Sequence, residues 1–307
     1  MWSKLVLAGL SLVVVGLVGA AVVTKRQVER RTTDLVDGLL SAPSLPERTY
    51  QVADLDGLPG PVQRYLRRVL RDGQPYVRSL RVEQRGTFRA GEATAAWRPF
   101  TATQHVTVRP PGFVWDASIR MMAGLPVRVL DAYHDGRGVL EARLGGLLPV
   151  MTGEPGPKLD EGELLRYLAE APLYPTALLP EMGVTWTPID DRSARATLTD
   201  RGTTATLVIH FNDNDEVVRV EGRRGFTRAD GQIEDRPWRG YWRDYAEREG
   251  MWVPTRGEVA WVHPEAGEVS YWRGQLHTFA YEINNDVGSP KEPLSAPGSS
   301  TTAAAPN

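Results

Sequence analysis

The stretch GFVWDASIRM, residues 112–121, alternates between apolar and polar side chains. One face of this segment carries Phe113, Trp115, Ala117, Ile119 and Met121. The opposite face carries Val114, Asp116, Ser118 and Arg120. Because successive side chains of a strand point to opposite faces of a sheet, the pattern predicts an antiparallel strand with one buried face.

The same alternation recurs along the chain, in residues 80–89, 194–199, 204–211, 217–223, 258–263 and 269–281. Turn sequences rich in Gly, Pro, Asn and Asp separate these segments, at 109–112, 135–138, 212–215, 229–231 and 264–267. Short strands joined by short turns form an antiparallel meander. A sheet of about ten such strands must curl or close.

Three helices are expected beside this sheet. The first opens at Pro59 or Pro61 and buries residues 62, 65, 66, 69 and 70 at helical spacing. The second runs from Asp160 to Ala171 and ends at Pro172, and a short third one covers Thr176 to Met182. The fold class is therefore α+β, a large curved antiparallel sheet, as a half-barrel or open barrel, with a few packed helices.

An apolar segment precedes this domain. Residues 5–23 carry no charge and reach roughly 28 Å as a helix, about the thickness of a bilayer's hydrocarbon core. We expect one N-terminal transmembrane helix, and hence a single-pass protein of the cell membrane. A cleaved signal peptide ending near Gly19-Ala20-Ala21, or a buried helix, is the alternative. Four basic residues follow the segment and favour a cytoplasmic main domain, although the side stays open.

The resulting organisation has four parts: the anchor at 5–23, a stalk or linker at 24–57, the β-rich domain at 58–283 and a disordered tail at 284–307. The chain of 307 residues contains no cysteine, which excludes disulfides and thiolate metal sites. Its net charge of −2 lacks the basic excess of nucleic-acid-binding proteins. The membrane bilayer and an amphiphilic ligand are the expected partners.

Motifs of known chemistry are missing from the sequence. It has no Gly-x-Ser-x-Gly elbow, phosphate-binding glycine loop, dinucleotide fingerprint or His-Glu-x-x-His helix, and its five histidines are scattered. We therefore expect no cofactor and no metal site, and the catalytic residues of any enzyme stay unknown. Asp131 and His134 are an acid/base candidate, but positions three apart on a strand face opposite sides.

The predicted helix at 160–171 carries a polar row. Glu163 and Arg166 are spaced to pair at i,i+3, and Arg166 and Glu170 at i,i+4, either on the surface or as a cluster aimed into the sheet. A negative charge near a helix C-terminus is unfavourable. We therefore predict that Glu170 has a second partner from the sheet, an arginine or a backbone N–H.

Several ordered blocks resemble a bacterial family described only as a domain of unknown function. They are WRPFTA (97–102), PGFVW (111–115), DAYHDGRG (131–138), RYLAE (166–170), PTALL (175–179) and PWRG (237–240). The resemblance covers about residues 58–281 and implies no activity. The order of strands and helices is also similar to that of lipoprotein-carrier proteins, which implies a curved half-barrel that holds acyl chains beneath helices.

These observations favour a noncatalytic, membrane-anchored β domain that binds a lipid or other amphiphilic ligand in a groove of the curved sheet. The candidate ligand-binding residues are Phe113, Trp115, Met121, Arg166, Glu170 and Trp238. One alternative is a hydrolase-like enzyme that uses Asp131, His134 or Glu170 in the sheet cleft. Another is a scaffold for envelope proteins.

Overall fold

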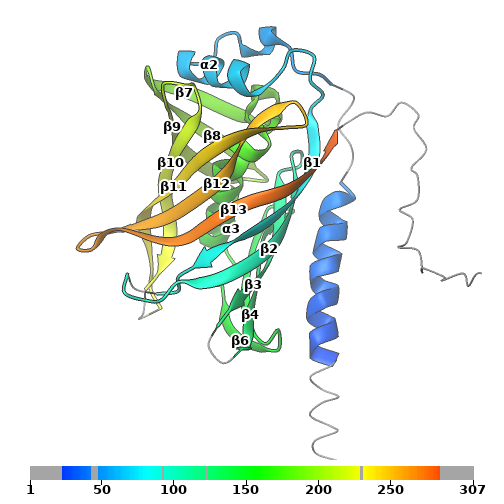
Figure 1. Cartoon of the computed structure of the whole chain (residues 1–307), viewed down its shortest axis with the longest axis vertical. Coiled ribbons are helices and arrows are strands. Elements are labelled where there is room, and N and C mark those ends of the chain that lie inside the picture. The colour runs from blue at the N-terminus through cyan, green and yellow to red at the C-terminus, as the bar shows by residue number, and fades with distance from the viewer. Residues whose placement is uncertain (1–22, 43–47, 92, 122–123, 229–230, 284–307) are drawn as a thin grey trace, which may run out of the picture.

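The computed structural model describes residues 23–42, 48–91, 93–121, 124–228 and 231–283 (Figure 1). Within these residues, thirteen strands form one antiparallel sheet in the order β6-β5-β4-β3-β2-β1-β13-β12-β11-β10-β9-β8-β7. Two meanders make up this order, β1 to β6 and β7 to β13. Pairing of β1 with β13 joins the two meanders at the centre of the sheet.

The strands of the first meander are β1 (Val77–Phe88), β2 (Arg98–Thr107), β3 (Gly112–Arg120), β4 (Pro126–His134), β5 (Arg137–Leu144) and β6 (Leu148–Thr152). Those of the second are β7 (Val184–Asp190), β8 (Ser193–Asp200), β9 (Thr203–Phe211), β10 (Val217–Thr227), β11 (Ile233–Arg248), β12 (Met251–His263) and β13 (Gly267–Ile283). The predicted curved sheet is thus confirmed, with more strands than expected. Strand β6 has no buried residue, so no alternation reveals it in the sequence.

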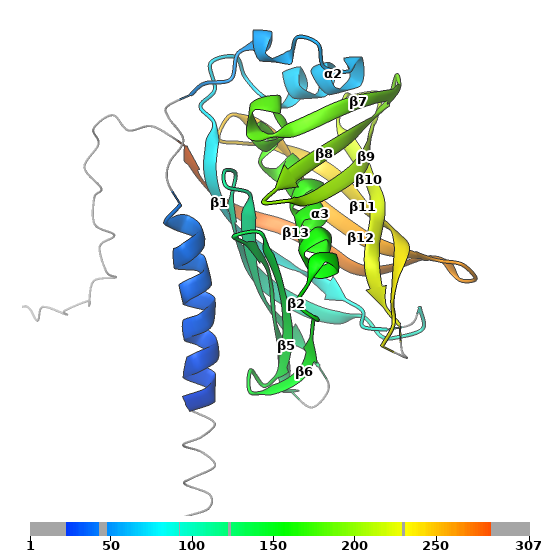
Figure 2. The same ribbon diagram turned by 180° about the vertical axis from the view of Figure 1, so that it is seen from behind.

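The sheet curls around α3 (Pro157–Glu170), which lies on its concave side between the two meanders (Figures 1 and 2). This helix contacts β4 and β5 of one meander and β9 and β10 of the other. Helix α2 (Gly60–Val69) packs against β8 and β12 at one end of the sheet. The core of the domain therefore lies between α3, α2 and the inner face of the sheet.

The prediction of a short third helix over Thr176 to Met182 is wrong in detail. Residues 171–182 form three short 3-10 turns instead, η3 (Ala171–Leu173), η4 (Pro175–Leu178) and η5 (Pro180–Met182). Leu179 interrupts them with an extended backbone, ψ 143°. Proline disfavours the α conformation of the residue before it, so Pro180 explains the break. A further 3-10 turn, η1 (Val52–Leu55), precedes α2.

A row of glycines lets the centre of the sheet bend. Gly86 on β1 faces Gly274 on β13, which in turn faces Gly257 on β12. A Cβ at Gly274 would lie 2.2 Å from the Trp272 ring, and one at Gly86 would lie 1.9 Å from a backbone oxygen of β13. Only glycine allows this close approach of backbone and indole.

Residues 23–40, within the segment expected to be a stalk, form a helix (Figure 1). It lies along the outer face of the first meander, where Leu39 packs against Val114, Leu130 and Ala132. No helix of the described residues is long and apolar enough to cross a membrane. The predicted anchor, apart from Val23, and the predicted disordered tail lie outside the described residues.

Candidate functional site

Three neighbouring strands place one row of functional side chains on the concave face. Gln104 on β2 is directly opposite Trp115 on β3, and Trp115 is directly opposite Asp131 on β4. Facing residues of an antiparallel pair project from the same side of the sheet. The row therefore points as a group toward α3.

Helix α3 adds two charged side chains to this row. Arg166 donates through Nε to Glu170 Oε1 at 2.9 Å, and its Nη1 donates to Asp131 Oδ2. The amide of Gln104 donates to the second oxygen of Glu170. The predicted partner from the sheet is therefore present, but it is a glutamine side chain rather than an arginine or a backbone N–H.

Hydrogen bonds continue from Gln104 across the sheet. Gln84 on β1 donates through Nε2 to Gln104 Oε1 at 2.6 Å, and Trp115 Nε1 donates to Gln84 Oε1 at 2.9 Å. Both glutamines are buried. Buried polar groups without partners are costly, so this chain of bonds holds each amide in one orientation and positions Glu170.

The guanidinium of Arg166 also stacks on aromatic rings. Its central carbon lies 4.7 Å from the Phe113 ring centroid and 5.1 Å from that of Trp115, within range of a cation–π interaction. Burial alone would lower the pKa of Arg166, but Glu170 and Asp131 outweigh burial and raise it. The arginine therefore stays charged in a largely apolar setting.

A second ion pair lies further along α3. Arg224 on β10 donates through Nη2 to Glu163 Oε1 at 3.0 Å, and its guanidinium lies 5.6 Å from the Trp238 ring centroid. Trp238 in turn donates to the Tyr271 hydroxyl at 2.9 Å. Glu163 pairs with Arg224 of the second meander in place of Arg166, the i,i+3 partner expected from spacing. We call these two ion-pair groups, Arg166–Asp131–Glu170 and Arg224–Glu163, the charged cluster.

Glu163 and Asp131 each present one unsatisfied oxygen. Glu163 Oε2 and Asp131 Oδ1 are buried without a hydrogen-bond partner among the described residues. Burial raises the pKa of Glu163 well above its usual value, and the negative charge of Asp131 raises the pKa further, against the effect of Arg224. When Glu163 is protonated, one of its oxygens is a donor and the partnerless oxygen of Asp131 is an acceptor. In that form the charged cluster holds two carboxylates and two guanidiniums, whose charges balance.

An aromatic floor adjoins the charged cluster on the concave face; we define it as Phe88, Phe100, Trp261, Tyr271 and Trp272. Successive ring centroids lie 5.7 Å apart for Phe100 and Trp272, 6.1 Å for Phe88 and Tyr271, and 6.0 Å for Trp261 and Tyr271. All but Phe100 are only partly buried. Apolar surface thus stays accessible next to the buried core.

The structure brings most predicted binding residues together. Arg166 pairs with Glu170 and lies against the rings of Phe113 and Trp115. Trp238 lies at the other ion-pair group, beside Arg224. Met121 is exposed at the end of β3 and does not join them. His134 lies beside Gly38 of the outer helix, whereas Asp131 binds Arg166, so this candidate acid/base pair is not assembled.

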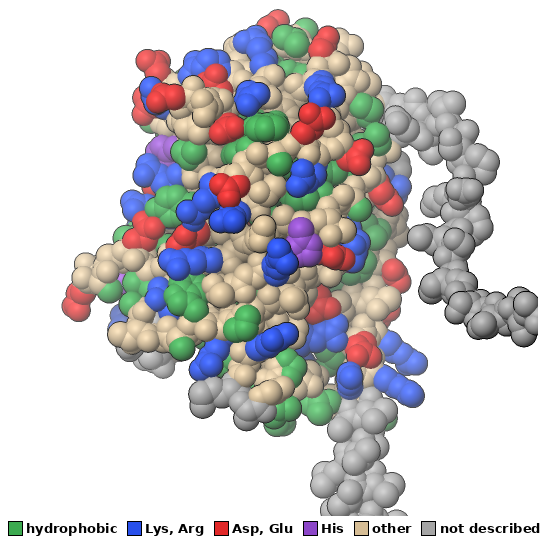
Figure 3. Space-filling view, viewed as in Figure 1, with side chains coloured by type: hydrophobic (Ala, Val, Ile, Leu, Met, Phe, Trp, Pro, Cys, Tyr) green, Lys and Arg blue, Asp and Glu red, His purple; other side chains and the backbone are tan. Residues whose placement is uncertain are grey.

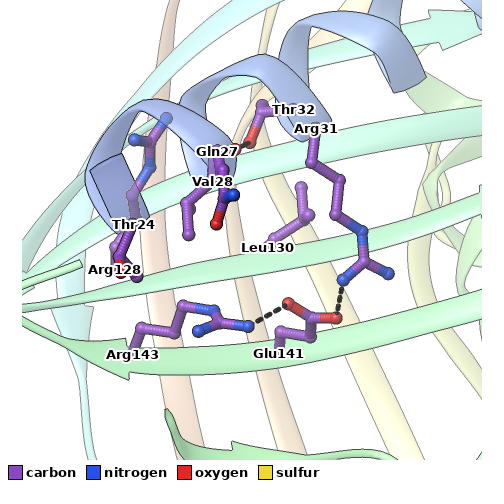
Figure 4. A pocket seen from close by; sticks show the side chains of 9 residues that line it. All are labelled: Thr24, Gln27, Val28, Arg31, Thr32, Arg128, Leu130, Glu141 and Arg143. Atoms are coloured by element: carbon purple, nitrogen blue, oxygen red, sulfur yellow. Dashed lines mark hydrogen bonds and ion pairs between the residues drawn. The ribbon is translucent and has the colours of Figure 1, made fainter. Parts of the chain in front are cut away.

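The outer face carries a pocket of its own. The helix over residues 23–40 and strands β4 and β5 enclose about 130 Å³, lined by Thr24, Gln27, Val28, Arg31, Thr32, Arg128, Leu130, Glu141 and Arg143 (Figure 4). Arg31 and Arg143 both pair with Glu141 there. These contacts fasten the helix to the sheet. Among the described residues, no group of three or more His, Asp or Glu side chains is placed to hold a metal ion.

Comparison with known proteins agrees with the blocks found in the sequence. The model of a family of unknown function, DUF6920, matches residues 56–281. The chain belongs to this family. No curated protein matches it.

One similar solved structure is the LolA superfamily protein NE2245 from Nitrosomonas europaea. It shares 14% sequence identity, and the match covers 73% of this chain and 95% of that one with a TM-score of 0.36. The resemblance to the family of unknown function is confirmed, whereas the resemblance to lipoprotein-carrier half-barrels stays an expectation. A likeness of this strength has no bearing on function, which must be inferred from the site itself.

Proposed function

We propose that this DUF6920 member binds an apolar or amphiphilic ligand, such as a lipid, on the concave face of its sheet. The observation that carries the proposal is the aromatic floor, in which every ring except that of Phe100 is only partly buried beside the core. Removing such surface from water favours binding by about 25 cal/mol for each Å². The anchor predicted at residues 5–23 belongs to the same proposal, because it would keep the site at a membrane.

The charged cluster supports a binding role over a hydrolytic one. Asp131 and Glu170 both form ion pairs with Arg166, and the partnerless oxygen of Asp131 is buried. Rings of Phe113 and Trp115 cover the guanidinium. The cluster therefore acts as an ion-paired wall that orients α3 over the aromatic floor.

The proposal can be tested by cross-linking the full chain, reconstituted in phosphatidylcholine vesicles, with a photoactivatable palmitic acid. We expect cross-links in β12 and β13 that excess unlabelled palmitic acid suppresses. Trp261→Ala removes a ring of the aromatic floor and should reduce these cross-links. Trp186→Ala is the matched control, because Trp186 is also a partly buried core tryptophan but lies on β7.

Two results would count against the proposal. Cross-links that unlabelled palmitic acid cannot suppress would show nonspecific labelling. Equal labelling of the Trp261→Ala and Trp186→Ala variants, both folded by circular dichroism, would place the ligand elsewhere.

A further inference from the structure

Exposed apolar side chains gather on two hairpin turns of the first meander. They are Met121 and Leu125, between β3 and β4, and Leu148, Val150 and Met151, at and beyond the β5–β6 turn. Leu148 is 65% exposed and Leu125 is 53% exposed. Isolated apolar residues are common on protein surfaces, but a concentration of large ones indicates a contact with a partner or a membrane. We call these five residues the apolar tip.

The described parts of the two turns lie side by side. Val127 pairs with Leu144 where β4 and β5 meet the turns, and the N–H of Gly145 donates to the carbonyl of Pro126 at 2.7 Å. Both turns therefore extend from the same end of the sheet. The hydrogen bond from Gly145 to Pro126 joins the two turns at their base.

The outer helix begins at this end of the sheet. Lys25 lines a surface groove together with Pro126, Gly145 and Gly146. At the other end of the helix, Leu39 lies beside Gly112. Figures 1 and 2 also show that the first described turn of the helix is level with the end of the sheet at β4 and β6. The predicted anchor is therefore followed in the chain by the end of the helix that lies near the apolar tip.

Basic side chains follow the predicted anchor in the sequence and lie at the end of the helix near the apolar tip. Lys25, Arg26 and Arg30 are exposed on the first turns of the helix. Figure 3 shows Lys and Arg side chains gathered around that end of the helix. Apolar groups flanked by exposed basic ones are typical of surfaces that enter the lipid interface, where the cations meet anionic headgroups.

We propose that the apolar tip is a membrane contact that inserts among the lipid headgroups of the bilayer in which residues 5–23 are anchored. The domain then has a fixed orientation, with the β3–β4 and β5–β6 turns toward the bilayer and α2 away from it. Phe100 of the aromatic floor is directly opposite Ile119, two residues before Met121, so this end of the floor also faces the lipid. The contact stands without the ligand-binding proposal, because it rests on different residues.

The absence of cysteine allows a direct test, since any introduced thiol is unique. The full chain with Leu125→Cys or Leu148→Cys is labelled with an environment-sensitive fluorophore and reconstituted into 3:1 phosphatidylcholine–phosphatidylglycerol vesicles. Lipids that carry a nitroxide quencher near the headgroup are then added. Val52→Cys and Ile189→Cys are matched controls, because both residues are exposed and apolar but lie outside the tip.

We expect a greater loss of fluorescence from the tip labels than from the controls. Leu148→Glu should reduce the loss measured at position 125, whereas an anchor that merely holds the domain nearby would leave it unchanged. Equal loss at tip and control positions would overturn the proposal. Disulfide cross-linking between tip cysteines of two molecules, without quenching by lipid, would also overturn it and would indicate contact between copies of the chain.

Discussion

Glu170, the last residue of α3, accepts a hydrogen bond from the side-chain amide of Gln104 in the centre of β2. The same carboxylate accepts from Arg166 at 2.9 Å. One acidic side chain thus connects the helix to the floor of the sheet. Helix α3 is held over the concave face by this polar contact as well as by its apolar residues.

Replacing Glu170 should therefore destabilise the domain. Glu170→Gln loses the charge that Arg166 and Gln104 both recognise, and hydrogen bonds to charged groups each contribute about 1.5–3 kcal/mol. We expect the free energy of unfolding to fall by about 2 kcal/mol in chemical denaturation. Glu161→Gln, on the exposed part of the same helix, is the control and should have little effect. Equal stability of the two variants would disprove the inward role of Glu170.

Glu163 should make stability depend on pH. Burial raises its pKa above 4.5, so the folded protein keeps a proton that the unfolded chain releases. Stability is then fully present below about pH 4.5 and falls as pH rises through the higher folded pKa. Glu163→Gln mimics the protonated form and should remove this part of the slope. Denaturation of both proteins between about pH 5 and 8 measures it, and parallel curves would contradict a shared proton.

Arg166 should be the most sensitive residue of the charged cluster. Arg166→Met leaves Asp131 and Glu170 without their common cation, and removing one partner of a buried ion pair costs about 3–5 kcal/mol. Arg166→Lys keeps the charge but cannot present the same fork of donors, so we expect an intermediate loss. Thermal melts of both variants give the comparison. A lysine variant no more stable than the methionine variant would argue that geometry, not charge, dominates.

Within the glycine row, a side chain at Gly86 should be the more damaging change. Gly86→Ala brings a Cβ to 1.9 Å from a backbone oxygen of β13, which cannot move without breaking the pairing. Gly274→Ala meets only the Trp272 ring, which can shift. We expect Gly86→Ala to lower the melting temperature more than Gly274→Ala does. Gly60→Ala, at the exposed start of α2, is the control and should be neutral or stabilising.

Local patterns were sufficient to predict much of the fold. Alternation in residues 112–121 specifies both the strand β3 and its buried face, because the side-chain period of a strand is two. Helix α3 begins at Pro157, three residues before the predicted start at Asp160, and ends shortly before Pro172. The family blocks likewise lie on these elements and could be read without coordinates.

Tertiary structure alone decided the partners within the site. Gln84 and Gln104 occupy inward positions of their strands, and a polar amide on an otherwise apolar face was the signal that could have revealed them. Spacing favoured Arg166 as the partner of Glu163, yet Arg224, 61 residues further along the chain, takes that place. Periodicity determines which face a side chain occupies, but strand register and sheet curvature determine what it meets there, and both arise only when distant segments pack together.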